Sequence, residues 1–470
     1  MQIEVDAYID ELYEQNMWIT EIQKIKLRQR IRDEGWSIED IDAAVARNRE
    51  KAVSRCARIL DKIDDKDAYY CLDDLIYPVG NEVAVRVRPR FTTQRLTGTY
   101  TVVISPYYTF EYHPYEKFEP QTLTAEAHDN AIEFSWTFDH EDMYLITVAW
   151  QIGESSCQLF RAHAYALDAD LFGMGFYKAD LHCHTTFSDG CEAPELTAAS
   201  ARESGLDIIA VTDHNEFLGS VVARERAEQM GLGLTVILGE EYSLDYSPMH
   251  ILALGTKEAV DRRFITRRVF ETEEAQRIMA NPPELTCDVR AYAGTQVLLA
   301  EVARLGGVSI LAHPYWKPVW SDGSRMDTPE NLFLELGRHR RFDGIELVSG
   351  SPRGEHDTTA KQVALAQEIF GRFEGVPLLG ITDSHKYASE PIAGEHFTVV
   401  IAPSRGADDV LEALRAGRCT AVEVVDGVPL CFGTSRLVKL ASFLTRWYFP
   451  ARDRMARREG ETAKMRYLTA

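Results

Sequence analysis

The chain has 470 residues, of which 51 are Lys or Arg and 73 are Asp or Glu, so its formal net charge is −22. Hydrophobic residues make up 45% and charged residues 26%, which is ordinary for a globular protein and excludes global disorder. At roughly 100–200 residues per domain, the length predicts about two to four folded units. The negative field repels phosphate backbones, so we expect no duplex nucleic acid among the partners.

The sequence shows no sign of a membrane span or of secretion. No apolar run reaches the ~18 residues that a spanning helix requires, and the first residues lack the basic and apolar regions of a signal peptide. The eight cysteines are scattered without CxxC spacing, which is typical of reduced, buried thiols. These features predict a cytoplasmic protein.

Two patterns divide the first part of the chain. Apolar residues at spacings of three and four predict a helical segment over 1–65, in which Ser37 is the expected N-cap of a helix. From 78 to 172, segments rich in β-branched and aromatic residues alternate in polarity and are separated by turn residues. Several such segments at short intervals predict a small all-β, sandwich-like domain.

Strand-like and helix-like segments alternate from residue 176 to residue 427. This alternation is typical of an α/β fold with a parallel sheet or barrel, whose functional side chains gather at the carboxyl ends of the strands. The segment 428–470 is different, because it contains nine Lys or Arg and three acids from Arg436 onward. We expect it to form an appendage that packs on the acidic body, with Pro450 interrupting any single helix.

The first strand-like segment of the α/β region ends in His182 and His184. Alternate side chains of a strand point to the same side, so both imidazoles can reach one cation, whereas Cys183 faces the core. Taken alone the pair is a weak signal, and two strand histidines with polar partners are the ordinary alternative.

Residues of the same kind recur near the later strands. They are Asp189, His214, Glu241 with Glu240 beside it, His250, His313, Glu346, Asp383 and His385, of which only His250 precedes its strand. Each has a structural explanation of its own, such as a helix cap or a strand end, but together they indicate a metal centre. Imidazole and carboxylate without thiolate suit Mn, Fe or Zn, and a shared carboxylate can hold two cations about 3.5–4 Å apart.

The order of these motifs resembles a known family. The succession DLHCHTTFSDG, TDHN, GEEYS, AHP and TDSH is similar to the PHP (polymerase and histidinol phosphatase) metallohydrolase domain, most of all to its carbaryl esterase-like branch and its nucleotide phosphatases. The resemblance covers about 176–427. It implies a distorted (β/α)7 barrel that holds two or three divalent metal ions, usually Mn, Zn or Fe.

Carried over residue by residue, the resemblance implies three groups of metal ligands. The first would be His182, His184 and Asp383; the second His250 and His313, to which Glu241 bridges; and the third Asp189, His214 and His385. Glu241, His250 and His313 would be the catalytic residues, and Glu240 remains the alternative to Glu241. Asp180 and Asp213 are expected to orient neighbouring imidazoles.

These features predict a metal-dependent hydrolase that acts through a metal-bound hydroxide on a small anionic substrate, a phosphomonoester or phosphodiester. One alternative is a carboxylic or carbamate esterase or amidase on the same centre. Another is a non-catalytic metal-binding scaffold, against which the complete ligand set argues.

Other features near the predicted centre have two interpretations each. Four arginines (Arg262, Arg263, Arg267 and Arg268) could clamp an anion, although an exposed charged face is the simpler explanation. Trp316, Lys317 and Trp320 follow His313 and are equally compatible with a substrate wall and with a packed loop. Arg353 and Lys386 are candidate anion binders.

Overall fold

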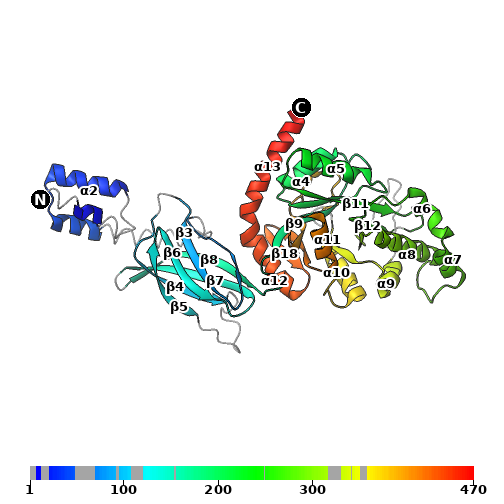
Figure 1. Ribbon diagram of the computed structural model, residues 1–470, viewed down its shortest axis with the longest axis horizontal. Helices are drawn as coiled ribbons and strands as arrows, with labels where there is room; N and C mark the ends of the chain where they lie inside the picture. Colours follow the sequence, from blue (N-terminus) through cyan, green and yellow to red (C-terminus); the bar gives the residue numbers. More distant parts are fainter. Residues whose placement is uncertain are drawn as a thin grey trace. The chain divides into compact units, whose positions relative to one another are not determined.

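The computed structural model describes residues 7–11, 21–47, 69–91, 95–106, 120–152, 155–247, 249–315, 330–339, 341–349 and 357–469. The chain divides into two compact units, Met1–Phe172 and Gly173–Ala470 (Figure 1). In the described part of the chain, no helix has both the length and the apolar character that crossing a membrane requires.

The first unit contains an N-terminal β-rich region. Its strands are β1 (Tyr70–Leu72), β2 (Ile76–Pro78), β3 (Glu82–Pro89), β4 (Thr99–Pro106), β5 (Gln121–His128), β6 (Ala131–Thr137), β7 (Asp142–Ile152) and β8 (Ser155–Leu167). They are hydrogen-bonded in the order β1-β3-β6-β5-β4-β7-β8-β2. Val85 of β3 and Phe160 of β8 lie in one core, so the sheet folds over on itself. This β-rich region was predicted, but its first two strands begin before residue 78.

Helices precede the β-rich region within 7–47. They include α2 (Glu21–Glu34) and a helix over 38–47. The hydroxyl of Ser37 accepts a hydrogen bond from the Asp40 N–H at 3.2 Å, and the Asp40 carboxylate accepts one from the Ser37 N–H at 2.9 Å. This reciprocal pair is a capping box and confirms Ser37 as the N-cap. The rest of the predicted helical segment (1–6, 12–20 and 48–65) lies outside the described residues.

The second unit is built on a mixed ten-stranded sheet that curls into a nearly closed barrel. Its strands are β9 (Gly175–Cys183), β10 (Ile208–Val211), β11 (Thr235–Ser243), β12 (His250–Leu254), β13 (Val308–Leu311), β14 (Gly344–Val348), β15 (Leu378–Gly380), β16 (His396–Ala402), β17 (Cys419–Val425) and β18 (Val428–Phe432). They are ordered β15-β14-β13-β12-β11-β10-β9-β16-β17-β18. The predicted α/β barrel is thereby confirmed.

Helices connect and cover these strands. They are α4 (Pro194–Glu203), α5 (Leu218–Gln229), α6 (Arg262–Thr266), α7 (Glu273–Ala280), α8 (Val289–Arg304), α9 (Glu330–Arg338), α10 (Asp357–Phe370), α11 (Ala407–Arg415), α12 (Ser435–Phe443) and α13 (Phe449–Thr469), with the short helical turns η3 (Arg268–Glu271), η4 (Tyr387–Ser389) and η5 (Leu444–Tyr448). Their buried faces pack on two clusters of aliphatic side chains, one of which fills the barrel interior around Leu181, Ile237 and Ile310.

The barrel curls until β15 reaches β16 and β17. The hydroxyl of Thr398 accepts a hydrogen bond from the Gly380 N–H at 3.0 Å and donates one to the Gly380 carbonyl at 2.9 Å. A Cβ atom on Gly380 would lie 2.5 Å from the carbonyl oxygen of Phe397. Only a residue without a side chain therefore permits this approach.

Strand β12 runs antiparallel to both of its neighbours, which the alternation of strands and helices did not predict. In its register with β11, His250 lies opposite Ser243, at the carboxyl end of β11. His250, the first residue of its strand, thus lies at the same edge of the sheet as residues that follow theirs.

The basic C-terminal segment was predicted to begin at residue 428 as an appendage, but it begins inside the sheet. Strand β18 pairs with β17, and α12, η5 and α13 follow. Helical residues run without a gap from α12 through the π-helical turn η5 into α13, and Pro450 is the second residue of α13. The helical run changes its hydrogen-bonding pattern just before Pro450 but is not interrupted by it, contrary to the prediction.

Helix α13 lies along α4 and contacts the barrel (Figure 1). The carboxylate of Asp453 lies 3.1 Å from the Lys178 ammonium, whose side chain is 5% exposed. Glu459 lies 3.0 Å from Arg202. These two contacts pair an acid of α13 with a base of the barrel, whereas Lys464 of α13 lies 2.6 Å from Glu203 of α4, in the direction that the net charges predict.

Replacing Gly460 by Ala is expected to lower the free energy of unfolding by about 1–3 kcal/mol, because a Cβ there would lie 2.2 Å from the backbone nitrogen of Glu203. Backbone cannot yield as a flexible side chain can, so α13 has to move away from α4. Denaturant unfolding measures the change. Glu461→Ala, at an exposed position of the same helix, is the control and should change stability little.

Candidate metal centre

The structure brings all nine predicted ligands together at one end of the barrel. Each has a side-chain nitrogen or oxygen within 3.3 Å of that of another member. They come from β9, β11 and β12 and from the loops that follow β9, β10, β13 and β15. Residues far apart in sequence therefore form one cluster, as the carboxyl-end rule for parallel strands requires.

One group of four atoms is closely spaced. The Nε2 atoms of His182 and His184 lie 3.2 Å apart. The Glu241 Oε2 atom lies 3.1 and 3.2 Å from these two nitrogens, and the Asp383 Oδ1 atom lies 3.3 and 3.1 Å from them. Ligands about 2.0–2.2 Å from one cation are themselves roughly 3.0–3.5 Å apart, so this group matches the edges of a coordination polyhedron.

Glu241 contacts histidines with both carboxylate oxygens. Its Oε2 atom faces His182 and His184, whereas its Oε1 atom lies 2.8 Å from His250 Nδ1 and 2.9 Å from His313 Nε2. Such a carboxylate can be shared by two cations.

The neighbouring Glu240 points to the other face of β11. Its carboxylate accepts hydrogen bonds from the Tyr242 hydroxyl at 3.0 Å and from the Val260 N–H at 3.3 Å. Burial raises the pKa of Glu240 to about 7. The geometry therefore favours Glu241 over Glu240 as the bridging ligand.

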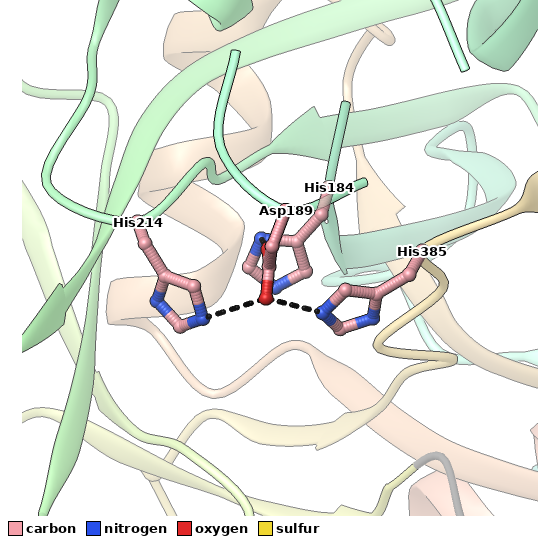
Figure 2. A group of neighbouring side chains, drawn as sticks. All are labelled: His184, Asp189, His214 and His385. Carbon is pink, nitrogen blue, oxygen red and sulfur yellow. Dashed lines mark ion pairs between the residues drawn. The ribbon is translucent and has the colours of Figure 1, made fainter. Parts of the chain in front are cut away.

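A third group is looser, and in it Asp189 lies between His214 and His385 (Figure 2). The Asp189 carboxylate lies 3.3 Å from His385 Nε2, 3.8 Å from His214 Nε2 and 3.7 Å from His184 Nδ1. We call Asp189, His214 and His385 the open group. Their side chains are 55%, 25% and 39% exposed, whereas those of His182 and His184 are fully buried. Solvent, and any substrate, therefore reaches the cluster from this side.

Opposite charges crowd the cluster and shift its proton affinities. Burial alone would lower the pKa of His184, but the carboxylates of Asp383 and Glu241 raise it to about 9. Burial lowers the pKa of His214 to about 4. The hydrogen bond from His385 holds the pKa of Asp189 well below its ordinary value. Imidazoles this close to carboxylates must share either protons or metal cations with them.

The donor set fits divalent metal ions. Two imidazole Nε2 atoms that face each other at 3.2 Å both offer lone pairs to one point, unless a proton intervenes. The ligand atoms are imidazole nitrogens and carboxylate oxygens, without a thiolate, which suits Mn, Fe or Zn. Three sets of such atoms lie within 4.8 Å of one another: His182, His184, Glu241 and Asp383; His184, Asp189, His214 and His385; and His214, Glu241 and His250.

Glu346 supports two of these ligands, a role that the sequence did not reveal. Its side chain is fully buried in β14, and its Oε1 atom lies 2.8 Å from His182 Nδ1. Its Oε2 atom accepts a hydrogen bond of 2.6 Å from the backbone N–H of His313, whose φ of 22° is unusual for a residue with a side chain. A carboxylate only accepts, so it fixes the proton of His182 on Nδ1 and leaves Nε2 for a cation.

Asp180 and Asp213 were expected to orient imidazoles, but neither carboxylate bonds to an imidazole ring in the described structure. Asp180 is fully buried and accepts hydrogen bonds from the Thr382 hydroxyl at 2.5 Å and the Tyr387 hydroxyl at 2.8 Å. Asp213 accepts from Thr185 and from the Ser188 hydroxyl, at 2.7 and 2.6 Å. Both carboxylates thus fix the loops that carry ligands.

The structure describes some of the other side chains that were candidates for binding an anion or lining a substrate site. Arg262, Arg263, Arg267 and Arg268 are all exposed, as an ordinary charged face requires. Lys386 is exposed beside His385. Trp316, Lys317, Trp320 and Arg353 lie outside the described residues.

Comparison with known proteins agrees with this centre. Residues 180–376 match the family model of the PHP domain. The 5'-3' exoribonuclease Rnm of Escherichia coli is 40% identical over 78 residues, which are 16% of this chain and 27% of that protein. The phosphoribosyl 1,2-cyclic phosphate 1,2-diphosphodiesterase of Eggerthella lenta is 39% identical over 83 residues, 17% of this chain and 31% of that protein. The chain thus spans under a third of these relatives.

A two-domain Bacteroides vulgatus protein described as containing a predicted PHP-like metal-dependent phosphoesterase matches at a TM-score of 0.38 and 21% identity, over 53% of this chain and 66% of that one. The matched segment 180–376 contains seven of the nine predicted ligands, and Asp383 and His385 lie a few residues beyond it. The chain therefore carries a PHP domain at residues 180–376.

Proposed function

We propose that the chain is a metal-dependent hydrolase, a phosphoesterase that acts on small phosphomonoesters or phosphodiesters. The observation that carries this proposal is Glu241, whose two oxygens lie within 3.2 Å of five imidazoles, so that one carboxylate can join two cations. A purely structural ion would be enclosed on all sides, but this cluster is open at Asp189 and His385.

The buried and the exposed residues of the cluster would hold different cations. His182, His184, Glu241 and Asp383 would hold cations on the buried side, with Glu346 fixing the ring of His182. The open group would hold a further cation where substrate enters. When bound, such cations supply an activated water and neutralise phosphate charge.

The charge of the cluster supports an anionic substrate. Three divalent cations would contribute +6, and Asp189, Glu241 and Asp383 contribute −3, while the six histidines bind as neutral imidazoles. The remaining excess of +3 suits a dianionic phosphate. An uncharged ester requires neither this excess nor the open group.

Replacing Asp189 by Ala is therefore expected to lower kcat/KM for a phosphomonoester at least about a hundredfold, because it removes the carboxylate of the open group. Its hydrolysis of an uncharged aryl ester should change far less. Metal-reconstituted enzyme is assayed on p-nitrophenyl phosphate, bis(p-nitrophenyl) phosphate, p-nitrophenyl acetate and a single-stranded RNA.

Asp245→Ala, a substitution of another loop carboxylate, controls for general damage. If Asp189→Ala keeps full activity on phosphate esters, the phosphatase proposal fails and an esterase takes its place. Preferential cleavage of the RNA would contradict the small substrate that we propose. It would instead agree with the activity named for the Escherichia coli relative.

A further inference from the structure

Three loops supply the open group, and two of them are joined by their backbones. The loop after β9 carries Asp189, and the loop after β15 carries His385. The His184 N–H donates to the Ser384 carbonyl at 2.9 Å, and the Cys191 N–H donates to the His385 carbonyl at 2.7 Å. The distance between Asp189 and His385 therefore depends on how firmly these loops are held together.

The side chain of Glu192 adds a further link between the two loops. Its carboxylate accepts the N–H of Ala388 with both oxygens, at 3.1 and 3.2 Å. Its own carbonyl accepts the N–H of Thr186 at 2.9 Å, which closes the loop around Asp189. Ala388 lies in η4, three residues after His385. Glu192 thus connects the loop that carries Asp189 with the turn η4, which follows His385.

The surroundings of this carboxylate are unusual. Glu192 is only 6% exposed, and none of the described residues with a positive charge forms an ion pair with it. Burying a carboxylate without a cation is unfavourable unless hydrogen bonds compensate for the lost hydration. The contacts to Ala388 are therefore expected to be structurally important. A neutral amide side chain could accept the Ala388 N–H with its one oxygen. It could not offer the two equivalent oxygens with which the Glu192 carboxylate contacts this N–H.

A second buried carboxylate holds the same turn from its other side. Asp180 of β9 accepts the hydroxyl of Tyr387, the residue before Ala388, at 2.8 Å. The turn η4 is therefore fixed by Asp180 at Tyr387 and by Glu192 at Ala388. In the described structure neither carboxylate bonds to a side chain of the cluster, although Asp180 accepts the backbone N–H of His182 at 3.4 Å.

We propose that Glu192 is a positioning residue for the open group: it holds Asp189 and His385 at the separation that lets them bind one cation. This inference rests on the proposed role of the open group as a cation site. Asp189 is 55% exposed and lies in a loop, so without such a link its carboxylate is free to turn toward water. Of the other predicted ligands, three lie on strands (His182, Glu241 and His250), and three have side chains that are at most 13% exposed (His184, His313 and Asp383). We therefore expect them to depend less on Glu192.

The test compares metal content among purified variants dialysed against Mn²⁺ and then desalted. Glu192→Ala should lose the same amount of manganese as Asp189→Ala, whereas Glu192→Gln, which keeps one oxygen for the Ala388 N–H, should keep most of it. The weakest-bound ion should dissociate about 10–100-fold more readily in Glu192→Ala. Glu195→Ala is the matched control, because Glu195 lies on α4 and pairs with Arg226 at 2.9 Å, apart from the open group.

Thermal unfolding separates positioning from a general structural effect. A structural effect lowers the melting temperature equally with EDTA and with Mn²⁺. A positioning residue affects the gain in melting temperature that Mn²⁺ produces, because it changes how many ions are held. We expect this gain to fall in Glu192→Ala to that of Asp189→Ala and to be normal in Glu195→Ala. If Glu192→Ala does not fold, Glu192→Asp, whose shorter side chain cannot make the same contact, replaces it with the same expectation.

Wild-type manganese content and a normal Mn²⁺-induced gain in Glu192→Ala would overturn the proposal. So would equal contents in wild type and Asp189→Ala, because the open group would then hold no ion. None of these measurements uses turnover. An enzyme that shows the expected metal losses but hydrolyses no phosphate ester would contradict the proposed function and leave the role of Glu192 intact.

Discussion

Glu241→Gln is expected to remove most of the bound metal and to lower hydrolysis of p-nitrophenyl phosphate by at least about a thousandfold. The carboxylate of Glu241 lies within 3.2 Å of five imidazoles, which include those of His182, His250 and His313. An amide replaces one of its oxygens by an NH₂ group, which donates hydrogen bonds and cannot bind a cation. Two groups of ligands lose a shared member at once.

Glu240→Gln is the matched control, because it is the same substitution on the adjacent residue of the same strand. Burial raises the pKa of Glu240 to about 7, so its protonated form, which Gln imitates, is already accessible near neutrality. A Gln oxygen can still accept from Tyr242 and Val260. We expect wild-type metal content and activity close to that of the wild type.

Metal analysis and steady-state kinetics on both variants decide between the two residues. Small and equal losses would show that neither carboxylate bridges two cations. A larger loss at Glu240 would reverse our assignment and would place the metal on the opposite face of β11.

Most of the predicted centre could be inferred from two rules: side chains alternate between the faces of a strand, and parallel strands end at the same edge of a sheet. His182 and His184 could be paired from their spacing alone, and the residues that follow β10, β13 and β15 meet them because parallel strands end at one edge of a barrel. The same alternation predicts that Glu240 and Glu241 point to opposite faces of β11. It does not predict which of the two faces lines the centre. The curl of the sheet decides that, and no local pattern encodes it.

The position of His250 and the supporting residues depended on contacts between distant segments. The reversal of β12 carries His250 to the centre, although the chain around it reads like the other strands. Asp180 shares a face with His182, which made it a reasonable partner for an imidazole, yet it binds Thr382 and Tyr387 across the barrel. Glu192 gave no signal at all, because its partner Ala388 contributes only a backbone N–H.

The second large effect is expected at Glu346, which touches no predicted cation site directly. Its carboxylate accepts from two donors, His182 Nδ1 at 2.8 Å and the His313 N–H at 2.6 Å. In Glu346→Gln the amide oxygen has to accept from the His313 N–H, because a backbone N–H always donates. The amide NH₂ group then faces His182 and donates to Nδ1.

This exchange would move the proton of His182 from Nδ1 to Nε2. A protonated Nε2 cannot bind a cation, and it points at the group formed by His184, Glu241 and Asp383. We therefore expect metal affinity to fall about 10–100-fold and hydrolysis to fall with it, although no ligand has been removed. Glu346→Asp should also lose metal, because the shorter side chain cannot reach both donors.

Titration of apo-protein with Mn²⁺ measures the affinity, and ¹⁵N spectra of histidine-labelled protein report the tautomer of His182. Glu335→Gln is the control: Glu335 is also buried, but it accepts from Thr286 and pairs with Arg338 away from the cluster. Weaker binding of Mn²⁺ with His182 still protonated at Nδ1 would mean that Glu346 acts through the backbone of His313 alone. Unchanged affinity would show that neither contact governs the metal. A changed tautomer together with a weaker affinity can only arise if Glu346 selects the nitrogen that His182 presents to the cation.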